Sequence, residues 1–156
     1  MIEPAAPLLI RSPVRGDRVF VALGDASDRL GWRRGKPPSD EGRCYVPLLE
    51  IGGDLAMGPF LYIVETDVED AQEEEFNAWY DTDHLPSLAA VPGVLAAGRF
   101  RLQRGEAPRY LAAYRLERPE VFEGPSWLAA RDTAWTRRVR RQFRNPRRTM
   151  RRLEDA

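Results

Sequence analysis

The sequence predicts an α+β domain with elements in the order β-α-β-β-α-β, preceded by an irregular extension. Three observations lead to this class. Residues 60–64 form a continuous apolar run. Over residues 94–103, every even-numbered residue is apolar or glycine, whereas the odd-numbered residues include two arginines. Apolar residues at helical spacing follow Asp70 and Gly124. A length of 156 residues is enough for one ordinary domain with such an extension.

Residues 1–57 are interrupted repeatedly by proline and glycine. Only two apolar runs, 18–23 and 45–49, are long enough for short strands, and residues 33–40 are expected to form an exposed loop. The sequence becomes regular afterwards. We therefore divide the chain into an N-terminal extension, 1–57, and a domain, 58–156, on which the extension packs.

The domain is expected to begin with a strand over residues 60–64, whose β-branched, apolar composition is typical of a strand covered on both faces. The helix that follows is predicted to be capped by Asp70. Glu73 stands three residues later, in the position of a capping box, and further acids follow in the first turn.

The inner face of this helix is predicted from three aromatic residues at positions i, i+3 and i+4, which are Phe76, Trp79 and Tyr80. Pro86 disfavours helical geometry at the residue before it. The helix is therefore expected to end near His84.

The rest of the domain is predicted as a hairpin, a helical region and a last strand. Alternation over 94–103 predicts one strand, and Gly105 and Pro108 mark the turn into a second over 109–116. A helix opens at Gly124-Pro125, a second helix carrying Trp135 is capped at Asp132-Thr133, and Asn145-Pro146 breaks it before a weakly patterned strand over 147–153. This order is that of the ferredoxin-like split β-α-β motif, with an antiparallel four-stranded sheet.

Charge is unevenly distributed although the net charge is zero. Residues 60–90 contain nine acids and no Lys or Arg, whereas residues 125–156 contain ten arginines and three acids. Opposite charges of this kind predict that the two segments meet, within a subunit or between subunits. Trp135, Val139 and Phe143 recur at four-residue spacing among these arginines, which favours a solvated or acid-paired helix face over a nucleic-acid surface.

Several classes of protein are disfavoured by composition. No apolar run approaches the ~20 residues that cross a bilayer, and the first residues lack the basic flank and apolar core of a secretory signal, so a cytoplasmic protein is expected. The single cysteine, Cys44, excludes a disulfide framework and has no recognisable His partner for thiol catalysis. Lys36 is the only lysine, a bias typical of a GC-rich bacterial genome.

Two sequence motifs resemble the dimeric α/β-barrel superfamily, and within it the EthD-like proteins and their uncharacterised relatives. The first is the stretch EFNAWYDTDHLP at 75–86, followed by VPGV at 91–94. The second comprises RYLAAY at 109–114 and WTRR at 135–138. The similarity covers roughly residues 58–153, and the extension has no counterpart in it.

The resemblance implies that two subunits pack their sheets face to face and close a barrel, so a homodimer is expected. Relatives include muconolactone isomerases, small antibiotic-biosynthesis monooxygenases, polyketide cyclases and haem-handling proteins. Many of these work without a metal or an organic cofactor, and none is expected here. A small-molecule ligand is the expected partner, without nucleic acid or membrane.

His84 is the only histidine and the only side chain expected to exchange protons near neutral pH. A position at a helix C-terminus beside Asp81 and Asp83 favours the imidazolium, so the ring could act as both acid and base, with Tyr80 orienting it or donating a hydrogen bond. The alternative is that His84 only caps the helix. The two aspartates are interpreted as exposed acids, so no metal site is predicted.

Five further residues are candidates for substrate binding. Two are arginines expected to face the barrel interior and hold a carboxylate or enolate, and three are aromatic residues that could wall a pocket: Arg99, Arg101, Tyr62, Trp79 and Tyr114. Tyr80, Trp127 and Trp135 are further aromatic residues that could belong to the same wall. The alternatives are that the arginines pair with acids such as Glu65 or Asp67, and that large aromatics, among them Phe76, Phe100 and Trp135, are simply core.

These residues favour a cofactor-independent isomerase, cyclase, lyase or monooxygenase-like enzyme that transfers a proton next to a carbonyl of an aromatic or polyketide-like compound. The alternative is a non-catalytic dimeric module that binds a ligand or assists a partner. An open, aromatic-lined pocket bordered by His84 would favour the enzyme. A site filled by side chains, or sealed by the extension, would favour the module.

Overall fold

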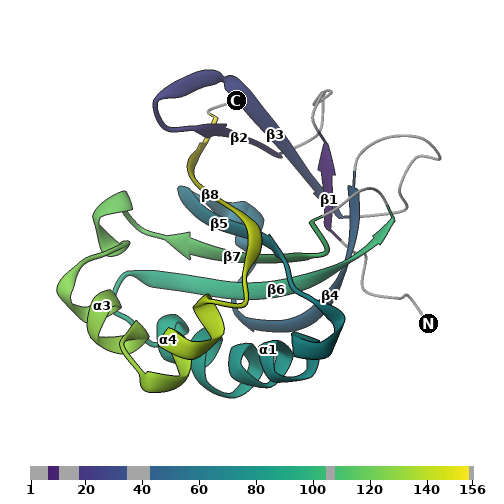
Figure 1. The fold of residues 1–156 in the computed structure, drawn as a ribbon. Helices are drawn as coiled ribbons and strands as arrows, with labels where there is room; N and C mark the ends of the chain where they lie inside the picture. The colour runs from purple at the N-terminus through teal and green to yellow at the C-terminus, as the bar shows by residue number, and fades with distance from the viewer. Residues whose placement is uncertain (1–6, 11–17, 35–42, 105–107, 155–156) are drawn as a thin grey trace.

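The computed structural model describes residues 7–10, 18–34, 43–104 and 108–154 (Figure 1). In chain order the main elements are β1 (Pro7–Ile10), β2 (Arg18–Ala22), β3 (Asp25–Arg34), β4 (Arg43–Gly52), β5 (Phe60–Asp67), α1 (Glu73–Trp79), α2 (Leu85–Ala89), β6 (Val94–Arg104), β7 (Tyr110–Leu116), α3 (Pro125–Arg131), α4 (Ala134–Arg140) and β8 (Arg144–Leu153). No helix in the described part of the chain is long and apolar enough to cross a membrane.

The predicted β-α-β-β-α-β order is confirmed. The four strands of the domain lie in the order β8-β5-β7-β6, and every neighbouring pair is antiparallel. Tyr62 at the middle of β5 pairs with Tyr114 on β7 and with Met150 on β8, which fixes the register of the sheet around it. The fold is therefore α+β and ferredoxin-like.

The sequence predicted a four-stranded sheet, but the observed sheet continues beyond these four strands. The extension supplies four more: β4 pairs with β6, β2 pairs with β8, and β3 and β1 connect the two edges. The result is a closed barrel in the order β1-β3-β2-β8-β5-β7-β6-β4. Closure gives hydrogen-bond partners to edge strands that would otherwise be unpaired.

The expected strand segments 18–23 and 45–49 lie in β2 and β4. Of the expected loop 33–40, residues 33 and 34 end β3 and the remainder lies outside the described residues. Cys44 lies in β4, but its side chain is not among those described.

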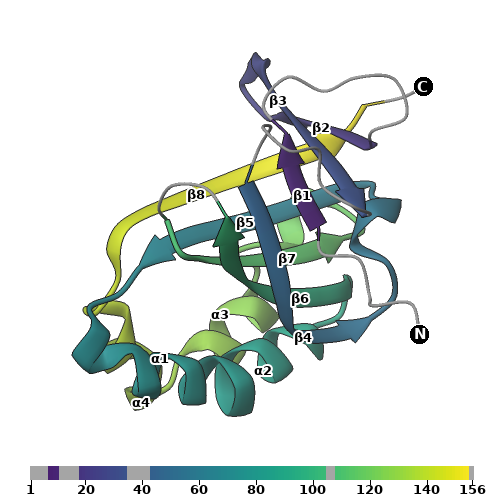
Figure 2. The ribbon, with the colours of Figure 1, turned by 90° about the vertical axis from the view of Figure 1, so that its right-hand side faces the viewer.

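The strand alternation places two hydrophobic cores on the two faces of the sheet. Helices α1–α4 cover one face, where Tyr62 and Val64 point, and β2, β3 and β4 cover the other, where Leu61 and Ile63 point (Figure 2). Trp32 of β3 packs edge-on against Phe100, with ring centroids 5.8 Å apart. The face expected to be covered by a second subunit is thus covered by the chain's own extension.

The first helical region differs from its prediction at both ends. Asp70 lies in a short 3-10 turn, Asp70–Gln72, that is preceded by Glu69, and no side chain caps it, so the predicted capping box is absent. The helix also does not end near His84. A π turn over Tyr80–His84 leads directly into α2, and this widened turn accommodates Pro86.

The second helical region agrees better with its prediction. α3 opens at Pro125, and Thr133 caps α4 by accepting a hydrogen bond from the Thr136 N–H at 3.0 Å. The predicted last strand over 147–153 is confirmed, and β8 begins three residues earlier, at Arg144. The helix before it ends at Arg140, ahead of the predicted break at Asn145-Pro146, and Asn145 adopts a positive φ of 50° within the strand.

The two oppositely charged segments meet within one chain, which is one of the two arrangements predicted from the sequence. Glu75 of α1 pairs with Arg138 of α4 at 3.1 Å, and Glu69 pairs with Arg144 at 2.9 Å. These ion pairs join the acidic first helical region to the basic C-terminal region.

Candidate functional site

A pocket lies on the helix-covered side of the sheet. It is lined by Tyr62, Val64, Trp79, Tyr80, His84, Leu88, Tyr114, Phe122, Trp127, Arg131, Arg140, Phe143 and Arg148. Five of the seven residues predicted from the sequence as site residues are among them: His84, Tyr80, Tyr62, Trp79 and Tyr114. The structure thus brings these five together, while Arg99 and Arg101 do not line the pocket.

The π turn brings both predicted catalytic residues to this pocket. The His84 ring stacks on Trp79, with centroids 4.2 Å apart and planes inclined by 20°, and meets Tyr80 edge-on at 5.4 Å. Trp79 is itself fixed, because its Nε1 donates to the Thr136 hydroxyl at 3.1 Å. The imidazole is therefore held against a rigid indole, and its Nδ1 has no hydrogen-bond partner among the described residues.

The expectation that His84 favours the imidazolium is wrong. Burial, together with the positive charges of Arg131 and Arg140, lowers the pKa of His84 to about 3. His84 also lies within a continuous helical segment and not at a helix end, so the stabilising C-terminal carbonyls are missing. The ring is therefore neutral at physiological pH.

The two aspartates beside His84 in the sequence face elsewhere. Asp83 accepts a hydrogen bond from the Thr133 hydroxyl at 3.1 Å, and Asp81 pairs with Arg99 at 2.8 Å. Within the described residues no group of His, Cys, Asp and Glu side chains is arranged to hold a metal ion.

Arg99 is a structural residue and not part of the pocket wall. It shares the helix-covered face with Ala97, whereas Phe100 faces the barrel interior, so the predicted orientation of the strand was wrong. The Arg99 side chain is only 2% exposed, and its Nη2 donates to Asn77 at 2.5 Å. Its guanidinium also lies 4.9 Å from the Tyr80 ring centroid.

Arg99 therefore pairs with an acid, which was the alternative considered from the sequence. The acid is Asp81 and not Glu65 or Asp67. Arg101 is exposed on the same strand.

The pocket wall is a cluster of stacked aromatic rings. Tyr62 stacks on Phe122 with centroids 4.1 Å apart, and Trp127 meets Tyr114 edge-on at 5.2 Å. Burial raises the pKa of Tyr62 to about 12 and raises the pKa of Tyr80 further above its usual range. All of these hydroxyls are therefore neutral hydrogen-bonding groups at physiological pH.

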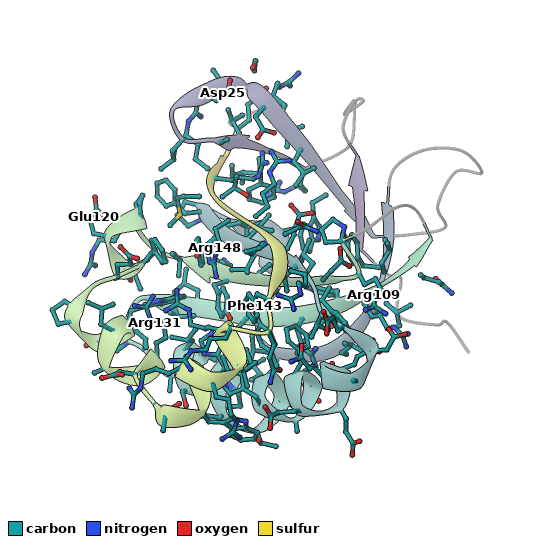
Figure 3. All side chains as sticks on the ribbon, in the orientation of Figure 1. Asp25, Arg109, Glu120, Arg131, Phe143 and Arg148 are labelled. Atoms are coloured by element: carbon teal, nitrogen blue, oxygen red, sulfur yellow. The ribbon has the colours of Figure 1, made fainter. Side chains whose placement is uncertain are left out.

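Three arginines at the pocket were not predicted as site residues. Arg131 of α3, Arg140 of α4 and Arg148 of β8 line it, and none of the three has an ion pair with a described carboxylate. Figure 3 shows Arg131 and Arg148 on the side where α3 and β8 approach, together with Phe143. Burial lowers the pKa of Arg140, and repulsion from Arg131 and Arg148 lowers it further, so the three charges act on one another.

The only signal in the sequence was the basic segment 125–156 itself. Arg137, Arg138 and Arg144 within it are paired with acids. Which arginines stay unpaired depends on the packing of α3, α4 and β8, and this cannot be seen from the order of residues.

The pocket has about 380 Å³ of empty space including its open mouth, but the part that the centre of a water molecule can reach is only about 40 Å³. An aromatic ligand therefore needs side chains at the mouth to move. Among the described residues, none that lines the pocket belongs to the extension. The pocket is aromatic-lined and bordered by His84, as expected of the enzyme, but side chains fill most of it, as expected of the module.

Comparison with known proteins identifies the fold. No protein-family model matches the chain, and no curated protein matches it by sequence. Among solved structures, it is similar to an uncharacterised ferredoxin-fold protein related to antibiotic biosynthesis monooxygenases from Listeria monocytogenes, with a TM-score of 0.67 and 10% identity over 97% of this chain and 96% of the other.

The names of two other similar solved structures include an enzyme activity. A haem-degrading enzyme from Listeria monocytogenes matches with a TM-score of 0.64 and 10% identity, over 92% of this chain and 88% of that one. An anthrone oxidase-like protein matches with a TM-score of 0.59 and 13% identity, over 96% and 78%. The chain thus has the ferredoxin-like fold of monooxygenase-like proteins.

Proposed function

We propose that this protein is a small-molecule enzyme that transfers a proton next to a carbonyl of an aromatic or polyketide-like anion. The observation that carries the proposal is the composition of the pocket: a wall of stacked aromatic rings beside three unpaired arginines and a neutral histidine. Aromatic walls bind flat rings, and guanidinium groups bind carboxylates and enolates through paired hydrogen bonds. An anionic aromatic compound satisfies both parts.

The names of two structural neighbours support this substrate class, because haem and anthrone are both planar aromatic compounds. The motif at residues 75–94 supports membership of the EthD-like branch. The resemblance implied a dimer formed through the open sheet face, but the chain's own extension covers that face. Self-association therefore stays a prediction without an assigned surface, and sedimentation velocity of the full chain tests it.

The proposed base is His84. Its neutral imidazole accepts the proton, and the negative charge that develops on the substrate oxygen is stabilised by Arg131 and Arg140, which replace Arg99 and Arg101 in this role. A bound anion also offsets the repulsion that these two arginines exert on an imidazolium. Binding of the anionic substrate therefore raises the pKa of His84 in the complex, where His84 accepts the proton.

Deuterium exchange tests the proposal. The substrate is 4-(3-oxobutanoyl)benzoate, an aromatic carboxylate with a methylene between two carbonyls, and the readout is loss of the methylene proton signal in D₂O. Wild-type protein is expected to accelerate exchange with saturation, and His84→Ala is expected to reduce that acceleration by about 10²–10⁴-fold. An unchanged rate in His84→Ala would show that the imidazole is not the base.

The second candidate function is a binding module without catalysis, which the narrow interior of the pocket favours. Saturable binding of the same compound, with no exchange above the buffer rate, would support the module and contradict the enzyme.

A further inference from the structure

We infer that Tyr114 and Trp127 form a pair of hydrogen-bond donors that recognises a carbonyl or enolate oxygen of the ligand. This rests on the proposed function, because it assigns an orientation to a ligand in the same pocket. It adds a specificity that the arginines cannot supply: the ligand must carry an acceptor oxygen in addition to its anionic group.

The two side chains carry polar atoms that nothing in the described chain satisfies. The Tyr114 hydroxyl and the Trp127 Nε1 are both buried and have no hydrogen-bond partner, and the two residues are 1% and 2% exposed. The Tyr80 hydroxyl interacts with the Tyr114 hydroxyl and raises the pKa of Tyr114, but the pair falls outside regular hydrogen-bond geometry. Each buried donor without a partner loses its hydration, and these two line one pocket, so a ligand acceptor bound there would stabilise both.

Both groups are donors. The indole Nε1 can only donate. Burial raises the pKa of the Tyr114 hydroxyl well above its usual range, so it keeps its proton at physiological pH. The atom that satisfies both is an acceptor, and a carbonyl or enolate oxygen has the two lone pairs required.

The helix fixes the distance between this donor pair and the anion site. Trp127 and Arg131 lie four residues apart on α3 and therefore on the same face, with side chains about 6 Å apart at their bases. The Trp127 ring also meets Tyr114 edge-on, with centroids 5.2 Å apart, and both residues line the same pocket. An aromatic acid that also carries a carbonyl offers a group to the arginines and an acceptor to the donor pair.

A matched pair of ligands tests the inference by binding alone. 4-Acetylbenzoate carries the acceptor oxygen, and 4-isopropylbenzoate has nearly the same shape without it. Isothermal titration calorimetry of the wild-type chain is expected to give about tenfold tighter binding of the acetyl compound, as two ordinary hydrogen bonds imply. Tyr114→Phe and Trp127→Phe are each expected to reduce this preference severalfold, measured as the ratio of the two affinities within each variant.

Tyr110→Phe is the control, because Tyr110 lies on the same strand and face as Tyr114 but bonds Glu73 and Asn77 outside the pocket. It is expected to keep the full preference. The wild-type ratio does not depend on the stability of any variant.

Equal affinity for the two compounds would overturn the inference while leaving the anionic aromatic pocket in place, and would indicate that water satisfies the two donors. A preference that survives in both Tyr114→Phe and Trp127→Phe would also overturn it. Binding of neither compound would contradict the proposed function, and the inference with it.

Discussion

His84 lies flat against Trp79 with its ring plane inclined by only 20°, in a pocket that contains three arginines and no described carboxylate. This relationship makes the histidine a neutral group and gives the fold a pH dependence. The pKa of His84 is about 3 in the folded chain and about 6.5 when unfolded. Protonation therefore favours the unfolded state.

The lowered pKa of His84 decides how the free energy of unfolding changes with pH. The stability contributed by the neutral ring is complete above pH 6.5 and is lost as the pH falls towards 3, by at most about 1.4 kcal/mol per pH unit. His84→Phe keeps the ring stacked on Trp79 but cannot titrate. Chemical denaturation at pH 7 and pH 4.5 is expected to show a smaller acid loss for His84→Phe than for the wild type, and equal losses would contradict the buried neutral ring.

Arg140→Gln is expected to weaken binding of 4-acetylbenzoate about tenfold, because a charge-assisted hydrogen bond is lost. The same change removes repulsion from Arg131 and Arg148, so the free energy of unfolding is expected to stay equal or increase. Arg141→Gln is the matched control, since Arg141 is exposed and does not line the pocket. Equal loss of affinity in the two variants would mean that only general positive charge attracts the ligand.

The buried guanidinium of Arg99 is expected to stabilise the fold and not to bind the ligand. Asp81→Ala leaves Arg99 buried with Asn77 as its remaining hydrogen-bond partner among the described residues, at a cost of about 2–3 kcal/mol. Glu117→Ala removes an exposed partner of Arg118 and is expected to cost less than about 1 kcal/mol. Similar denaturation midpoints for the two variants would indicate a solvated, unimportant pair at Arg99.

Closure of the barrel by the extension is tested by the packing of Trp32 on Phe100. Trp32→Ala is expected to lower the free energy of unfolding by about 3–5 kcal/mol, because it empties a fully buried site. Leu48→Ala on β4, another strand of the extension, removes a side chain that is 42% exposed and should stay within about 0.5 kcal/mol of wild type. A wild-type midpoint for Trp32→Ala would mean that the extension does not seal the barrel.

The features that sequence predicted correctly are local. The inward face of Phe76, Trp79 and Tyr80 follows from helical periodicity, and the Thr133 cap follows from a single side-chain hydrogen bond. The aromatic half of the site was found for the same reason, since regular spacing places Tyr62 and Tyr114 on one face of neighbouring strands.

The features that sequence missed depend on long-range pairing. β8 carries little apolar pattern because most of its side chains are exposed. Arg151 is buried and bonds Asp28 and the Phe20 carbonyl, both more than a hundred residues away. The alternation along β6 was visible, but it cannot say which face the helices cover, so Arg99 was assigned to the wrong side. The unpaired arginines of the pocket cannot be distinguished from their paired neighbours by sequence, because all of them are arginines in one basic segment.

The central claim is that an anionic aromatic compound binds between the arginines and His84, and the single histidine makes a direct measurement possible. Proton NMR of the imidazole Hε1 signal, during titration with 4-acetylbenzoate, is expected to show a saturable shift and a pKa of His84 raised from about 3 towards its ordinary value. An Hε1 signal and a pKa that stay unchanged at ligand concentrations in the millimolar range would contradict the account.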